Sequence, residues 1–424
     1  MSQFGEISRR RWIALGLGLA MGASSLAGCV GEAPAEGEGE SVDDVTDVSH
    51  TAVRRQSIGN CWLYAAVGWV ESIVRRQSGQ ESNFSESYLT YWDWYEKIQR
   101  GDFEGSGSTL EIETGGHWGS AVDLMLKRGI VTEADFLPEE AALEMSAAQS
   151  RALGIINESL RTGALSTPEA RRDRNLIRDE LDRAFGLSTM VIAKMDMLFG
   201  TDGARTLSTS NTEWARHPRT INAGAWRSRT SATRRSVKLA DLMGVNRSSW
   251  DPDKREGAYA WNGVAYPSWS ATERTNVLRR VMRALNDGHP VAISWLVDFN
   301  ALDNNGTFSL TELTRRGPGR QGGHLTVMDD YAVTNAPGFG TLDFGALSAE
   351  QRAAAAMGTT SRFLIKNSWG ASRPDRASQN GYYVLDMAYL NGPIRWSNGA
   401  ASPGSTPSYT NRTPLSSFVL PAGY

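Results

Sequence analysis

The 424-residue sequence predicts an α+β fold in which a helical first half precedes a β-rich second half. Two patterns support this prediction. Hydrophobic residues recur at helical spacing within residues 61–76, 84–99 and 117–128, and several later segments are rich in β-branched and aromatic residues. A hydrophobic content of 40% over this length suffices for the core of one large domain or two ordinary ones.

The helix expected over residues 61–76 is the most strongly patterned segment. Its apolar positions are Trp62, Leu63, Ala66, Trp69, Val70, Ile73 and Val74. Because these positions form one wide face at helical spacing, we expect this helix to be central and buried.

Residues 139–268 are predicted to be an insertion with two parts. Residues 139–184 have helical composition, with Thr167 as a cap, Pro168 as a first helical residue and Gly186 as a stop. Residues 200–266 lose this periodicity and are expected to form a long irregular excursion.

Regular structure is predicted to return at Ser270, which forms a capping-box pattern with Glu273. Strands are then expected over residues 291–297, 325–333, 363–369 and 381–390. His324 opens the second of these strands, and Asn367 lies near the end of the third. Residues 335–360 should project as a loop between these two strands.

Residues 1–29 have the pattern of an export signal. An arginine triplet at residues 9–11 precedes an apolar run over residues 12–26 that is too short to span a membrane permanently. The arginines resemble a twin-arginine motif, and LAGC at residues 26–29 resembles the lipobox of bacterial lipoproteins. The resemblance implies that Cys29 carries lipid and that the protein is exported and lipid-anchored in the cell envelope. An ordinary secretory signal with a chance cysteine is the alternative.

Residues 30–50 contain seven acidic residues and neither lysine nor arginine. Such a segment cannot bury enough apolar surface to fold, so we expect a disordered tether that leads into a domain over residues 51–424. The formal net charge of −3 produces no basic field, which argues against a nucleic-acid partner. Contact with a membrane is expected through lipid on Cys29.

Cys61 is the only cysteine of the predicted domain, and it begins the long helix after a glycine-containing loop. Helix-end amides and the helix dipole favour an anion there, so the position suits a thiolate. Among the five histidines, His324 follows two glycines at the start of a strand and is the best candidate base. Asn367 could accept a hydrogen bond from the imidazole and orient it. An inert buried cysteine is the alternative.

Three motifs carry a family resemblance. GNCW at residues 59–62, GH at 323–324 and KNSWG at 366–370 resemble, in order, the signature blocks of the papain superfamily. SESYL at residues 85–89 and the Gly115-Gly116 pair look closer to the bleomycin hydrolase and aminopeptidase C branch. The resemblance implies a papain-like two-lobed fold, with a helical N-terminal lobe and a β-rich C-terminal lobe.

The same resemblance implies a cysteine peptidase that hydrolyses peptide bonds. Cys61 would attack the peptide carbonyl and form a thioester, His324 would transfer protons, and Asn367 would orient His324. Gln56 and the Cys61 amide would form an oxyanion hole.

Three further residues are implied on the substrate side of the site. Gly115 and Gly116 would bind substrate backbone, and Trp369 would lie beside the site and cover the pair formed by His324 and Asn367. Neither a metal nor another cofactor is implied. Residues 303–312 resemble part of a calcium loop, but Ala301 occupies its first ligand position, so a surface turn is expected.

The sequence departs from the family pattern at several points. Gln56 stands five residues before Cys61 where the family has six, and Arg55 occupies the usual position. The insertion accounts for the long separation of Cys61 from His324. Only 31 residues lie between Cys29 and Cys61, so no long pro-segment is expected between them. Two other functions remain open: a non-proteolytic acyl-transfer enzyme of the same fold, and a binding protein without turnover.

Overall fold

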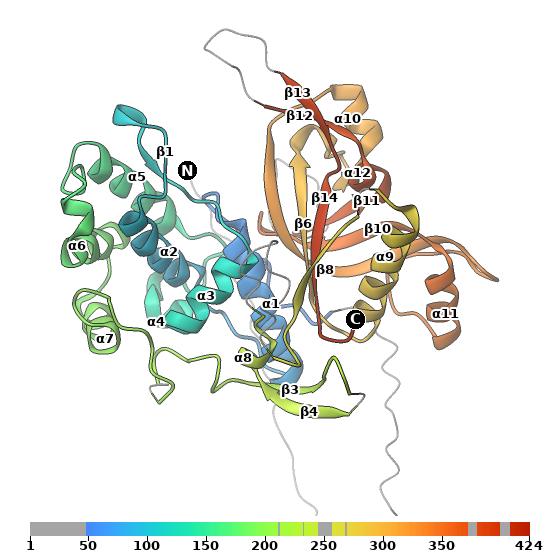
Figure 1. The fold of residues 1–424 in the computed structure, drawn as a ribbon, viewed down its shortest axis with the longest axis horizontal. Helices are drawn as coiled ribbons and strands as arrows, with labels where there is room; N and C mark the ends of the chain where they lie inside the picture. The colour runs from blue at the N-terminus through green and yellow to red at the C-terminus, as the bar shows by residue number, and fades with distance from the viewer. Residues whose placement is uncertain are drawn as a thin grey trace, which may run out of the picture. The chain divides into compact units, whose positions relative to one another are not determined.

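The computed structural model describes residues 48–210, 213–231, 233–244, 257–267, 269–371, 380–398 and 408–424. The predicted signal peptide and residues 30–47 of the predicted tether lie outside these ranges. The fold is α+β with two lobes, as predicted: one is built mainly from helices and the other around a large sheet (Figure 1). Each lobe has its own cluster of buried hydrophobic residues.

The first lobe contains helices α1 to α8 and two short hairpins. The helices are α1 (Cys61–Ser78), α2 (Glu86–Arg100), α3 (Trp118–Arg128), α4 (Glu133–Phe136), α5 (Ala147–Arg161), α6 (Arg174–Phe185), α7 (Thr189–Phe199) and α8 (Leu239–Leu242). The hairpins pair β1 (Phe103–Glu104) with β2 (Glu111–Ile112), and β3 (Asn222–Arg227) with β4 (Arg234–Lys238).

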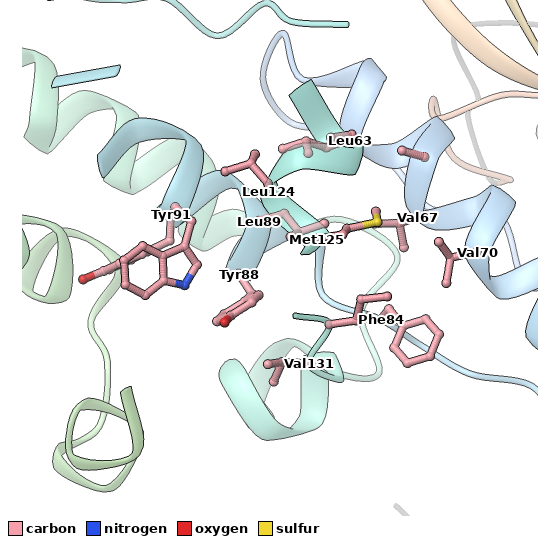
Figure 2. Packing of buried hydrophobic residues seen from close by; sticks show 14 of the residues in the cluster. Leu63, Val67, Val70, Phe84, Tyr88, Leu89, Tyr91, Leu124, Met125 and Val131 are labelled. Atoms are coloured by element: carbon pink, nitrogen blue, oxygen red, sulfur yellow. The ribbon is translucent and has the colours of Figure 1, made fainter. Parts of the chain in front are cut away.

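Helix α1 is the centre of this lobe, as its apolar pattern predicts. Every residue from Cys61 to Val74 is buried, and Gly79 ends the helix in the left-handed conformation with φ 71°. Figure 2 shows Leu63, Val67 and Val70 of α1 in one cluster with hydrophobic side chains of α2 and α3. Helix α1 also contacts strand β8 of the second lobe, so it lies at the boundary between the lobes (Figure 1).

The second lobe is an eight-stranded sheet. Its order is β5-β14-β6-β8-β10-β11-β7, with β9 paired to β8. The strands are β5 (Asn262–Ala265), β6 (Val291–Asp298), β7 (Thr307–Phe308), β8 (Gln321–Ala336), β9 (Gly340–Leu342), β10 (Thr359–Lys366), β11 (Tyr382–Asp386) and β14 (Leu415–Leu420). All pairings are antiparallel except that of β11 with β7.

Helices and a small hairpin complete the second lobe. They are α9 (Ala271–Asn286), α10 (Leu310–Arg316), α11 (Ala349–Met357), α12 (Met387–Asn391), and the pair β12 (Ile394–Ser397) and β13 (Tyr409–Arg412). Helix α9 packs on β6, β8 and β14. Ser270 caps this helix as predicted, because its hydroxyl accepts from the Glu273 amide. No helix of the described ranges is both long and apolar enough to cross a membrane.

Three boundaries differ from the prediction. The expected strand over residues 381–390 ends at Asp386, whose side chain caps α12 by accepting from the Ala388 amide. The helix expected from Pro168 begins instead at Arg174, because Asp173 accepts from two first-turn amides. Strand β8 begins three residues before His324, so His324 lies within the strand.

Residues 200–266 are more ordered than predicted. In addition to the β3–β4 hairpin and α8, this segment supplies β5, which extends the sheet by pairing with β14. Trp226 and Trp261 are buried in the first core, where Trp261 packs edge-on against Trp69 of α1, with 4.9 Å between ring centroids. The strands of this segment are only four to six residues long, so they leave little periodicity in the sequence.

The predicted tether boundary at residue 50 is wrong, because the folded domain begins earlier. Val48 is buried in the second core. His50 is buried between the lobes, with Nδ1 2.9 Å from the Ser72 hydroxyl of α1 and Nε2 3.2 Å from the Met328 carbonyl of β8. Burial, followed by the charge of Lys366, lowers the pKa of His50 to about 3, so the ring stays neutral and suits this interior.

Candidate active site

Cys61 is the first residue of α1, as predicted. Asn60 stands at the cap position, but its side chain forms no cap. Instead it donates to Thr90, at 2.9 Å, and to Gln149, at 2.8 Å. The Leu63 amide donates to the Asn60 carbonyl at 3.0 Å, whereas the Trp62 amide contacts the Cys61 thiol and favours its anionic form.

His324 and Asn367 are brought together by the pairing of neighbouring strands. In the ladder of β8 and β10, Lys366 lies opposite Val327, so the residues after Lys366 run alongside those before Val327. His324 Nε2 and Asn367 Oδ1 are 2.8 Å apart, and His324 also forms a side-chain hydrogen bond with Cys61. The three candidate residues therefore form one hydrogen-bonded chain.

Aromatic rings enclose the imidazole. Trp369 stacks on His324 with 5.0 Å between centroids and 17° between planes. Trp295, opposite His324 in the pairing of β6 and β8, meets the ring edge-on at 5.5 Å. Trp369 therefore lies against one face of the His324 ring.

The pKa values of Cys61 and His324 shift in opposite directions. Burial alone would raise the pKa of the Cys61 thiol, but the charge of His324 and its hydrogen bond outweigh burial and lower it. Backbone amides of Leu325 and Trp62 contribute in the same direction. Burial alone would lower the pKa of His324, and the charge and hydrogen bond of Cys61 raise it. A buried pair with these opposite shifts favours thiolate and imidazolium together.

Cys61 and His324 face a cleft of about 500 Å³ between the lobes. One side is formed by the loop that contains Gly115 and Gly116. The cleft is lined by Gly59, Cys61, Trp62, Gly115, Gly116, His117, Trp118, Gly119, Gly263, Ser294, Gly323, His324, Leu325, Ser417 and Val419. Gly115 and Gly116 therefore line the same cleft as Cys61.

Gln56 does not line this cleft. Its side-chain nitrogen donates to the Ile58 carbonyl at 2.7 Å, and its side-chain oxygen accepts from the Ser368 hydroxyl at 2.6 Å. The backbone amide of Gln56 also donates to the Ser368 carbonyl. Gln56 thus joins the segment before α1 to the residue that follows Asn367.

Several residues around the site have no recognisable signal in the sequence. Trp295 and Leu325 lie on predicted strands, and strand periodicity does not reveal which residues meet the imidazole or thiol. Asn60 looks like an ordinary helix cap. Knowledge of the strand register would have identified Trp295, because it lies directly opposite His324.

Comparisons with known proteins add a likeness of fold. Neither a protein-family model nor a curated protein sequence matches the chain. Among solved structures, PepW of Lactobacillus rhamnosis HN001 is similar at 13% identity and a TM-score of 0.43, over 88% of this chain and 80% of that one. Procathepsin L 3 from the larval midgut of Tenebrio molitor is similar at 12% identity and a TM-score of 0.35, over 91% and 71%. A clostridial cysteine protease is similar at 10% identity and a TM-score of 0.32, over 88% of this chain and 55% of that one.

Proposed function

We propose that this chain is a cysteine-type hydrolase that cleaves peptide bonds through a thioester on Cys61. The observation that carries the proposal is the hydrogen-bonded chain from Cys61 through His324 to Asn367, with opposite pKa shifts of thiol and imidazole, facing a cleft. A buried thiol held only for packing would have a raised pKa instead.

In the proposed reaction, the Cys61 thiolate attacks the peptide carbonyl, and His324 donates its proton to the leaving amine as the C–N bond breaks. A water molecule then attacks the thioester while His324 accepts its proton. The carboxylic acid leaves, and the thiolate is restored. Asn367 accepts from Nε2 of His324 throughout, which keeps the other ring nitrogen directed at Cys61.

Other groups near Cys61 are proposed to stabilise the oxyanion of the transition state and to bind the substrate backbone. The amide of Cys61 at the start of α1 would donate to the oxyanion. Gln56 does not line the cleft, and it would join the oxyanion hole only by turning its side-chain nitrogen from the Ile58 carbonyl toward Cys61. The backbone of Gly115 and Gly116 would pair with an extended peptide. Their lack of side chains lets a substrate backbone approach the loop closely.

The experiment that tests this function incubates the purified protein with a library of unmodified peptides and identifies new termini by mass spectrometry. We expect cleavage products that disappear when the protein is first treated with iodoacetamide. If no peptide is cleaved but the protein turns over an activated thioester in a separate assay, the acyl-transfer enzyme is favoured. Absence of both would favour a binding protein.

We also propose that residues 1–29 direct export and that lipid on Cys29 anchors the protein in the cell envelope, since LAGC precedes the acidic segment. In cells given an alkyne fatty acid, the protein should take up the label, and Cys29→Ser should not. Cys61→Ser is the matched control, because it removes the other cysteine and should keep the label. A wild-type protein without label would contradict the lipid anchor.

A further inference from the structure

Lys97 is a lysine of α2 whose side chain is buried, with only 5% of the residue exposed. Its ammonium contacts three oxygen atoms: Asp93 Oδ2 at 2.8 Å, the Glu113 carbonyl at 2.9 Å and the Gly115 carbonyl at 2.5 Å. The nitrogen also lies 5.5 Å from the centre of the Trp62 ring. An ammonium has three donors, so the three acceptors match its capacity.

The two carbonyls belong to residues 113–116, the loop that forms one side of the cleft. The carbonyl between them, that of Thr114, accepts from the Trp62 indole at 3.1 Å. Three successive carbonyls of the loop are therefore bonded to side chains of α1 and α2. The loop packs closely as well, because a Cβ on Gly116 would lie 2.4 Å from the Trp62 ring.

The opposite edge of the loop is available to a ligand. Within the described ranges, the amides of Gly115 and Gly116 and the carbonyl of Gly116 have no hydrogen-bond partner in the protein. Both glycines line the cleft beside Cys61. The loop thus has an inner edge bonded to the first lobe and an outer edge with free backbone groups.

Lys97 is buried beside Asp93 of the same helix. Burying an ammonium is unfavourable unless it is paired and hydrogen-bonded. Asp93, one helical turn before Lys97, supplies the paired charge, which leaves two donors for the loop. Burial raises the pKa of Asp93 to about 7, and the charge and hydrogen bond of Lys97 counter this only in part, so the pair offsets only part of the cost of burial.

We propose that Lys97 is a positioning residue for substrate binding, which holds residues 113–116 so that the Gly115-Gly116 backbone can bind an extended peptide beside Cys61. This inference rests on the proposed peptidase function. Lys97 reaches neither the thiol nor the imidazole, so its effect is on substrate affinity and on the order of the loop, with the nucleophile unaffected.

The test compares wild type with Lys97→Met, which keeps the length of the side chain and removes its donors. We expect KM for a peptide substrate to rise by about tenfold or more and kcat to change less than about threefold. This is the expected pattern when a variant loses a binding interaction that is equally strong in the ground state and the transition state. The rate at which iodoacetamide alkylates Cys61 should not change. Hydrogen exchange of the Ile112 and Glu113 amides, which donate to the Asn157 side chain and the Asp102 carbonyl, should become at least about tenfold faster as the loop loosens.

Two variants separate positioning from a general loss of stability. Arg178→Met removes another buried cation of the first lobe, which pairs with Asp182 and Asp196 and does not line the cleft, so its KM should stay within about twofold of wild type even if it unfolds more easily. Lys97→Met combined with Asp93→Leu replaces the buried pair by apolar side chains, a change that is often neutral for folding, and should show the same rise in KM.

A folded Lys97→Met protein with unchanged KM and unchanged loop exchange would overturn the positioning role. A parallel fall in the alkylation rate would overturn it too, because the effect would then reach the nucleophile. If loop exchange becomes faster but wild type cleaves no peptide, the proposed peptidase function fails, while the control of loop order by Lys97 stands.

Discussion

Cys61→Ala is expected to lower kcat/KM for peptide hydrolysis by at least about 10⁴-fold, because the proposed thioester cannot form without the thiol. Cys61 is the one cysteine of the described residues, and no second thiol in the cleft can replace it. The measurement is initial-rate hydrolysis of a peptide identified by library profiling, with thermal unfolding to show that the variant is folded.

Cys29→Ser is the matched control for this variant, since it replaces the chain's other cysteine. It should retain hydrolysis within about threefold of wild type when both proteins are assayed in the same detergent. Retention of more than a tenth of wild-type activity by Cys61→Ala would mean that another group forms the acyl intermediate, or that the reaction proceeds without one.

His324→Ala should shift the pH dependence of Cys61 alkylation upward. In wild type, the charge and hydrogen bond of His324 lower the pKa of the thiol, so iodoacetamide should react well below the unperturbed pKa of about 8.5. Without His324, burial is the largest remaining influence, and it raises the pKa of the thiol. At pH 6 the thiolate fraction, and with it the alkylation rate, should therefore fall by about 100-fold or more.

The expected pH dependence of activity follows from the lowered pKa of Cys61 and the raised pKa of His324. Activity of wild type should rise with pH as the thiol ionises at its lowered pKa, and should fall at higher pH as the imidazolium loses its proton at its raised pKa. His217→Ala is the control for His324→Ala in the alkylation experiment, because His217 is a histidine outside the cleft and its removal should leave the alkylation profile unchanged. An alkylation profile of His324→Ala that matches wild type would show that His324 does not control the thiol.

Much of the site could be predicted because Cys61 begins a helix and Asn367 directly follows a strand. Cys61 follows a glycine-containing loop and begins a strongly patterned helix, and the structure places it there. The sequence places His324 and Asn367 on two successive predicted strands, and antiparallel pairing of β8 with β10 brings His324 Nε2 within 2.8 Å of Asn367 Oδ1. Hydrophobic periodicity and turn residues contain this information because they act over short distances along the chain.

Other features depend on contacts between distant segments and have no local signal. Lys97 looks like a surface lysine of a helix, and only the path of residues 113–116 makes it a buried anchor. Asn60 matches a helix cap, yet contacts with Thr90 and Gln149 turn its side chain away. His50 was assigned to a disordered tether because the surrounding composition is acidic, whereas its partners lie 22 and 278 residues away in the chain.

The segment around β5 has a consequence for how the molecule responds to stress. Trp261 is buried in the core of the first lobe, Tyr266 is buried in the core of the second, and the strand between them is hydrogen-bonded to β14. Separation of the lobes would therefore expose one tryptophan or one tyrosine, and would strain or break an edge of the sheet. We expect heat or denaturant to unfold both lobes in a single cooperative transition, because neither core can be disrupted without loss of burial in the other.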